Sequence, residues 1–170
     1  QHLLTMMAGN QFDTIYHEHF SYLSLLAVER ILAHHSLTIF DVDEVPTHGG
    51  SLRIYARHAE NAGPAVGERV REIRQREIEG GFLTLERYRG FDEQVKATKR
   101  KLLTFLIEAK QGGKRIVAYG APGKGNTLLN YCAIRTDFLD FAVDANPYKH
   151  GKFTPGTRIP ILSPDRLCEA

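Results

Sequence analysis

The chain carries the stretch RIVAYGAPGKGNTLLNYCA at residues 115–133. Its apolar run, Arg115–Tyr119, is typical of a short buried strand, and the glycines of Gly120–Gly125 are typical of a tight turn. A helix is expected over Asn126–Ala133, and Phe141–Asp144 has the composition of a second buried strand. A strand, a turn, a helix and another strand in this order predict a right-handed crossover, so the two strands should be parallel.

The flanking residues extend this pattern to an α/β fold. Downstream, Ile159–Leu162 is expected to be an edge strand, because its proline cannot donate a hydrogen bond to a ladder. Upstream, Ser24 is a candidate N-cap for a helix through His34. Residues 37–42 and 51–57 read as two strands, which are expected to form an antiparallel pair with a functional loop between them.

A charged stretch, residues 61–112, connects these two blocks. Gly63-Pro64 is expected to open a helix there, and Gly80-Gly81 to break it. A longer helix is predicted over Phe91–Lys110. Its apolar residues recur at near-heptad spacing and are expected to pack on the second block; they are Val95, Leu102, Leu106 and Ala109, with Leu103 and Ile107 widening the stripe.

Composition narrows the class of protein. The 170 residues leave room for one ordinary domain, or for a small domain and part of another. Apolar residues make up 42% and charged residues 25%, as in soluble globular proteins. There is no apolar run of about 18 residues and no secretion signal. Two cysteines without paired spacing favour a reducing compartment, so the cytoplasm is expected, and a net charge of +2 gives no reason to expect nucleic acid.

A titratable cluster lies at YHEHFSY, residues 16–22. Histidine titrates near neutral pH and can act as a general base, a carboxylate can orient it, and a phenol can donate to a developing oxyanion. Two other interpretations remain open. His17 and His19 could share a metal, although their spacing is not that of a helical zinc site. Alternatively, the aromatic rings could belong to a core with the histidines at its edge.

The glycine turn is a candidate phosphate site. Its glycines would let the backbone approach an anion at the start of a helix, and Lys124 would add a positive charge. The order of residues does not match a P-loop, and it matches the dinucleotide fingerprint only imperfectly. Asp144 lies where such a fold would bind a ribose hydroxyl. A tight turn that binds nothing is the alternative.

The loop after Asp144 is a second candidate for ligand contact. It follows the carboxyl end of a strand, where open α/β sheets bind their ligands. Its polar and aromatic side chains could hold a nucleotide diphosphate or could be solvated; they are Asn146, Tyr148, Lys149, His150 and Lys152.

Four segments together resemble the S-adenosylmethionine-dependent sugar C-methyltransferases, which act on nucleotide-linked ketosugars. They are residues 12–22 (FDTIYHEHFSY), 46–51 (PTHGGS), 119–131 (YGAPGKGNTLLNY) and 144–156 (DANPYKHGKFTPG). The resemblance covers nearly the whole chain, and its motifs are long.

The resemblance implies an architecture and two cofactors. Residues 1–58 are expected to be the tail of a class I methyltransferase core, residues 59–112 a helical connector, and residues 113–170 a truncated Rossmann-like substrate domain. Because the chain begins with Gln1 and lacks zinc-type cysteines and a donor-binding glycine motif, it is expected to be a fragment. S-adenosylmethionine would be bound by an upstream domain, zinc would occur only in the full-length parent, and no metal is expected in this piece.

The resemblance also implies roles for individual residues. His19 would remove a proton from the carbon next to the sugar's keto group, Tyr16 would steady the enolate oxygen, and Glu18 would orient the set. The substrate side would be formed by His17, Tyr22, His48, Gly49, Gly50, Ser51, Gly120, Lys124, Gly125, Asn126, Asn130, Asp144, Asn146 and Lys149.

Two other functions remain possible from the sequence. The first is a non-catalytic Rossmann-like module that binds a nucleotide or NAD(P). The second is an oligomerisation domain in which the helix at residues 91–110 pairs between chains. The sequence does not identify the sugar, the carbon that is methylated or the nucleotide base.

Overall fold

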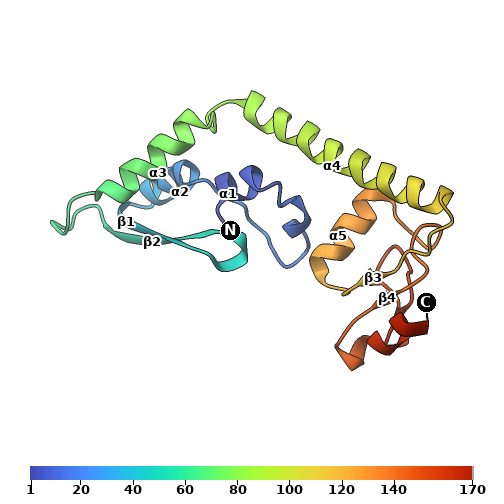
Figure 1. Ribbon diagram of the computed structural model, residues 1–170. Helices are drawn as coiled ribbons and strands as arrows, with labels where there is room; N and C mark the ends of the chain where they lie inside the picture. Colours follow the sequence, from blue (N-terminus) through green and yellow to red (C-terminus); the bar gives the residue numbers. More distant parts are fainter. Residues whose placement is uncertain (170) are drawn as a thin grey trace. The chain divides into compact units, whose positions relative to one another are not determined.

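The computed structural model describes residues 1–169, which form two compact units (Figure 1). The first unit contains residues 1–12 and 20–94, and the second contains residues 13–19 and those from Val95 onward. The candidate catalytic segment around Tyr16 therefore belongs to the second unit, although it lies early in the sequence. The domain boundaries expected at residues 58 and 112 concern the parent protein and stay a prediction.

The first unit is built on an antiparallel strand pair, as the sequence predicted. Strand β1 (Leu37–Val45) pairs with β2 (Ser51–His58), and a register shift at Phe40 marks a bulge. Helix α2 (Leu25–His34) begins at the predicted cap, where the Ser24 hydroxyl accepts a hydrogen bond from the Ala27 amide at 3.1 Å.

Two helices cover this strand pair. Helix α3 (Glu68–Glu79) lies beside α2 over the strands in Figure 1, and both helices contact β1. Helix α3 begins later than Gly63-Pro64 suggested, because the Gly67 amide donates to the Phe40 carbonyl at the bulge and holds the preceding residues extended. The core between them consists of Leu25, Ile39, Val42, Val70 and Ile73.

A second cluster of the first unit was not predicted. Helix α1 (Leu3–Ala8) buries Met6 and Met7 against Phe82. The helix has only six residues and no side-chain cap, so it leaves little trace in the sequence.

Helix α4 (Leu85–Gln111) is longer than the predicted Phe91–Lys110. Its first turn has no buried stripe, since Leu85 is 72% exposed, and the apolar period could not reveal it. Within the second unit, Val95 and Leu106 are buried as expected, whereas the prediction for Ile107 is wrong because that side chain is 44% exposed.

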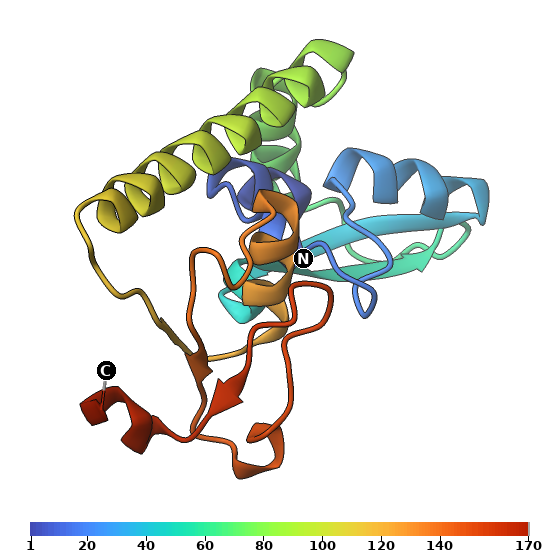
Figure 2. The same cartoon turned by 90° about the vertical axis from the view of Figure 1, so that its right-hand side faces the viewer.

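The second unit contains a parallel sheet, which confirms the α/β class. Strands β3 (Ala118–Tyr119), β4 (Ala142–Val143) and β5 (Ile161–Leu162) lie in the order β3-β4-β5, and β4 and β5 run side by side in Figure 2. Helix α5 (Gly123–Cys132) forms the crossover between β3 and β4. The core of this unit consists of Leu106, Cys132, Ile134, Leu139, Ala142 and Ile159.

Four short 3-10 helices complete the described elements: Phe12–Thr14, Thr47–Gly49, Pro147–Lys149 and Pro164–Glu169. No helix within residues 1–169 is both long enough and apolar enough to cross a membrane.

Candidate active site

The segment Asp13–His19 folds back on itself within the second unit. The Tyr16 amide donates to the Thr14 carbonyl at 3.1 Å, and the His19 amide donates to the Tyr16 carbonyl at 2.9 Å. These turns place the Tyr16 and His19 rings 4.5 Å apart between centroids. The phenol and the imidazole predicted to work together are therefore in contact.

His19 is oriented by a backbone carbonyl. Its Nδ1 lies 2.8 Å from the carbonyl oxygen of Thr14, a residue that is fully buried. A carbonyl oxygen can only accept a hydrogen bond, so in the neutral imidazole Nδ1 carries the hydrogen and Nε2 carries the basic lone pair. The ring is half-buried, which leaves the side chain access to solvent or substrate. This is the arrangement that a general base requires.

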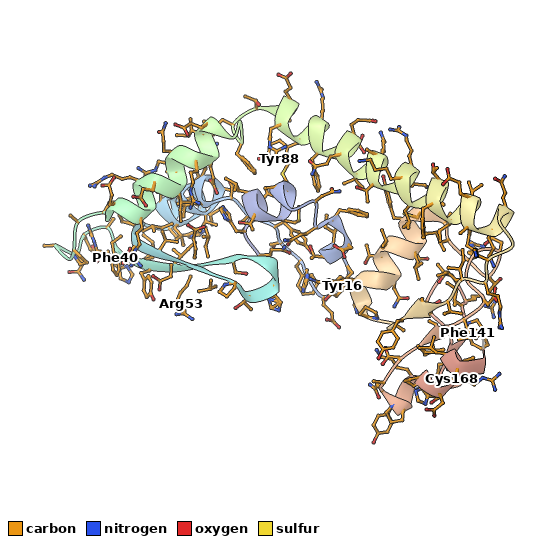
Figure 3. All side chains as sticks on the ribbon, viewed as in Figure 1. Tyr16, Phe40, Arg53, Tyr88, Phe141 and Cys168 are labelled. Atoms are coloured by element: carbon orange, nitrogen blue, oxygen red, sulfur yellow. The ribbon has the colours of Figure 1, made fainter. Side chains whose placement is uncertain are left out.

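A cavity of about 370 Å³ lies next to this segment. Its volume falls within the usual range for small-molecule sites. A side-chain carbon at position 123 would lie 3.6 Å from the Tyr16 ring, so the tyrosine packs directly on the first residue of α5 (Figure 3). The cavity is lined by Tyr16, His17, Glu18, Gly123, Asn126, Thr127, Asn130 and Pro155.

Glu18, which was expected to orient the set, lies closest to His17. Its carboxylate lies 3.9 Å from His17 Nε2, and both side chains are largely exposed. The His19 ring donates instead to the buried Thr14 carbonyl. The sequence could not reveal this orienting group, because a backbone carbonyl carries no residue signature.

The glycine turn supplies the opposite wall of the cavity. Gly120 has φ of +91°, which favours glycine, whereas Gly123 and Gly125 already belong to the first turn of α5. The helix therefore begins before the predicted Asn126. Its first amides have no side-chain cap, and Lys124 lies within this uncapped turn.

The helix wall is made of uncharged polar groups. The Asn130 amide donates to the Asn126 carbonyl at 2.8 Å and to the Pro155 carbonyl at 2.9 Å. The Thr127 hydroxyl donates to the Gly123 carbonyl at 3.4 Å. The two asparagines were predicted from the sequence, whereas Thr127 and Pro155 were not, because a single threonine on a helix or a proline in a loop has no distinctive pattern.

Asp144 joins the glycine turn to the loop after β4. Its carboxylate accepts from the Ala121 amide at 2.8 Å, the Asn146 amide at 2.9 Å and the Lys149 ammonium at 2.8 Å. The Lys149 hydrogen bond, followed by the two amides, holds the pKa of Asp144 well below its usual range. Three of the predicted substrate residues are thus brought together, but here they bind one another.

The remaining predicted substrate residues lie in the first unit. Tyr22 packs against the cluster of Met6 and Met7. His48 is exposed with φ of +56°, in the turn between β1 and β2. Gly49 and Gly50 also have positive φ, and the adjacent Ser51 hydroxyl donates to the Thr47 carbonyl.

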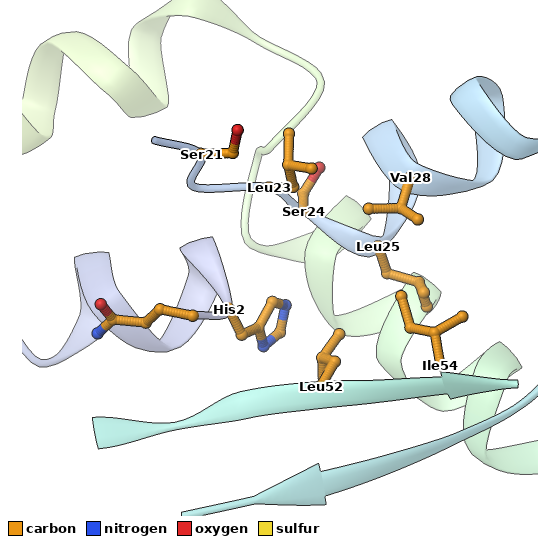
Figure 4. A pocket seen from close by; sticks show the side chains of 9 residues that line it. His2, Ser21, Leu23, Ser24, Leu25, Val28, Leu52 and Ile54 are labelled. Atoms are coloured by element: carbon orange, nitrogen blue, oxygen red, sulfur yellow. The ribbon is translucent and has the colours of Figure 1, made fainter. Parts of the chain in front are cut away.

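The first unit contains a smaller cavity of about 170 Å³ (Figure 4). Its titratable lining residue is His2, which is 3% exposed and whose Nε2 lies 2.7 Å from the buried Glu77 carboxylate. Apolar side chains make up most of the other walls, including Leu25, Leu52 and Ile54. The imidazole is already paired, so this cavity resembles a packing defect more than a reaction site.

The described residues form no cluster that could hold a metal ion. Within residues 1–169, no three His, Cys, Asp or Glu side chains converge on one point. At the glycine turn, both oxygens of Asp144 already accept hydrogen bonds from the protein, which leaves fewer lone pairs for a ribose hydroxyl.

Comparison with known proteins identifies the family of this α/β chain. Residues 46–170 match the C-methyltransferase C-terminal domain family, and the chain belongs to that family. It is 37% identical over 171 residues to the C-methyltransferase NovU from Streptomyces niveus. That similarity covers 97% of this chain and 39% of the relative, so the chain spans well under half of the relative's length.

Proposed function

We propose that the chain supplies the general base and the sugar pocket of an S-adenosylmethionine-dependent C-methyltransferase acting on a nucleotide-linked ketosugar. One observation carries the proposal: His19 donates from Nδ1 to the buried Thr14 carbonyl, with its ring against Tyr16, which lines a cavity of suitable size. Membership of the C-methyltransferase family supports the reaction class.

We further propose a division of labour along the chain. Residues 1–58 would complete a class I methyltransferase core, and residues 113–170 would form a Rossmann-like substrate domain. Residues 59–112 would be the helical connector between these two parts. The parallel order β3-β4-β5 supports the last assignment. The short match to the relative supports the idea that other residues provide the donor site.

The proposed chemistry begins with proton removal. The keto group acidifies the hydrogen on the neighbouring carbon, and His19 Nε2 accepts that proton while its electron pair moves into the enolate. The Tyr16 hydroxyl donates to the enolate oxygen. The enolate carbon then takes a methyl group from the sulfonium donor, whose carbon–sulfur pair stays on sulfur. The protein contributes mainly by holding the reactants in position.

Isotope exchange separates proton removal from methyl transfer. The complete enzyme, meaning this chain with the donor-binding residues that accompany it, is incubated with a nucleotide-linked ketosugar in heavy water. We expect His19→Ala to lower both deuterium uptake next to the keto group and methyl transfer by about a thousandfold, because a general base contributes roughly 10²–10⁴-fold. Binding of sugar and donor should persist.

A matched histidine serves as the control. His58 is exposed at the end of β2 in the first unit, and His58→Ala should leave both rates unchanged. Near-normal deuterium uptake in His19→Ala would show that another group removes the proton.

Binding to NAD(P) is not favoured as a second function. The carboxylate that would bind the ribose, Asp144, is engaged by Ala121, Asn146 and Lys149. Titration of the chain with NAD(P) should therefore give no heat, and saturable binding would revive that alternative.

A further inference from the structure

The cavity beside Tyr16 has a wall chemistry that selects its occupant. Its lining residues include no lysine or arginine, and its single carboxylate belongs to the exposed Glu18. A phosphate would meet no lysine or arginine there, and the imidazole of the lining belongs to His17, whose side chain is largely exposed. The walls offer a phenol, amides and a hydroxyl instead, which are groups that pair with the hydroxyls of a sugar ring.

Asn126 stands out among these groups. Its Oδ1 is buried and has no hydrogen-bond partner, and its side-chain amide makes no hydrogen bond among residues 1–169. A buried amide oxygen without a partner is costly, and such groups are rare in native proteins. The side chain lines the cavity, and its amide nitrogen, which makes no hydrogen bond either, is the atom that a ligand can reach, because the buried oxygen has almost no accessible surface.

The neighbouring polar groups are already occupied. Both N–H groups of Asn130 are directed at the Asn126 and Pro155 carbonyls. The Thr127 hydroxyl donates to the Gly123 carbonyl. Asn126 is therefore the amide of this wall whose N–H groups remain available to a ligand, and the oxygen of a sugar hydroxyl can accept such a hydrogen bond.

We propose that Asn126 determines substrate specificity by hydrogen bonding to one ring hydroxyl of the methyl acceptor. This inference rests on the proposed function, since it places the sugar ring in the cavity next to Tyr16. A site built to pair with a hydroxyl discriminates strongly against an analogue that lacks it, because its own polar group is then left unpaired.

A binding cycle between protein and ligand tests this pairing. The complete enzyme carrying His19→Ala, which blocks turnover, is titrated with a nucleotide-linked ketosugar and with analogues that each lack one ring hydroxyl. We expect Asn126→Ala to weaken binding of the parent sugar about tenfold. One analogue lacks the hydroxyl that pairs with Asn126. For that analogue, the enzyme with His19→Ala alone and the enzyme that also carries Asn126→Ala should have affinities within about twofold of each other, because neither can form the hydrogen bond.

Stability measurements keep the test independent of folding. Asn126→Ala removes no hydrogen bond of the protein, so it should leave the melting temperature as high as that of Asn61→Ala, an exposed control in the first unit. A marked loss of stability would assign Asn126 a structural role and overturn the inference.

The two proposals fail in different ways. If Asn126→Ala weakens the binding of every analogue by the same factor, or of none, the pairing is refuted while the proposed function stands. If the reference enzyme binds no nucleotide-linked ketosugar, the proposed function itself is overturned and the inference falls with it.

Discussion

Gly156 illustrates how one residue holds the loop that closes the cavity. Its φ is +79°, and a side-chain carbon there would lie 2.9 Å from Asn130 Cγ and would overlap the Asn130 oxygen. Asn130 ties α5 to the Pro155 carbonyl. The glycine is thus required both for its backbone angle and for the approach of the asparagine.

Gly156→Ala should destabilise the second unit by about 1 kcal/mol more than Gly151→Ala, because it displaces Asn130 from its hydrogen bonds. Gly151 is the matched control: it has a similar φ of +74°, but nothing lies within 4 Å of its added carbon. Urea unfolding of the two variants measures the difference. Equal losses would mean that only the backbone angle matters.

At the scale of elements, Asp144 connects the turn before α5 with the 3-10 helix Pro147–Lys149. Its carboxylate accepts hydrogen bonds from the Ala121 and Asn146 amides and the Lys149 ammonium. The backbone carbonyl of Asp144 accepts a hydrogen bond from His150 Nε2 at 2.7 Å. The loop that follows β4 is therefore held against the glycine turn by a carboxylate rather than by apolar packing.

Asp144→Asn should speed amide hydrogen exchange at Ala121 and Asn146, since the neutral amide loses the Lys149 ion pair. The exposed Asp137→Asn is the control. The pKa of Asp144 is lowered in the folded state. Its contribution to the stability of the folded state is therefore present above the ordinary carboxylate pKa and disappears as pH falls through the lowered pKa. Protection that is unchanged in Asp144→Asn would contradict this role.

At the scale of the whole molecule, one buried carboxylate joins three helices of the first unit. Glu77 of α3 accepts from the Leu25 and Leu26 amides at the start of α2, at 2.6 and 2.9 Å, and pairs with His2 before α1. Burial raises the pKa of Glu77, but the hydrogen bonds from His2 and the two amides outweigh it, so the pKa is lowered.

Glu77→Leu should destabilise the first unit by about 3 kcal/mol, because it leaves His2 and two buried amides without their acceptor. The exposed Glu72→Gln on the same helix should have little effect.

The lowered pKa of Glu77 also predicts a pH dependence. Since the pKa of Glu77 is lowered in the folded state, the stability that this carboxylate gives to the first unit is present above about pH 4.3 and is lost as pH falls below that value. Melting curves between pH 3 and pH 7 should lose this acid dependence in Glu77→Leu; a slope that persists would exclude Glu77 as its source.

Local signals explain which elements could be predicted. The Ser24 cap and the alternating residues of β2 are contiguous in sequence, so α2 and the strand pair were found. The start of α4 was missed because Leu85 faces solvent. In the site, the residue types of His19 and Tyr16 were enough to predict a chemical role for them. Thr127 and the Thr14 carbonyl could not be predicted, because most threonines and backbone carbonyls in proteins have only structural roles.

The amino-acid sequence by itself determined the α/β class, the order of the helices and strands from α2 to β5 and the titratable set at residues 16–22, because periodicity, caps and side-chain chemistry are local properties. Only the tertiary structure decided that Tyr16 packs on Gly123, that His19 carries its hydrogen on Nδ1 and that the Asn126 oxygen is left without a partner. These facts depend on residues far apart in the chain or on a backbone carbonyl, and packing alone brings them together.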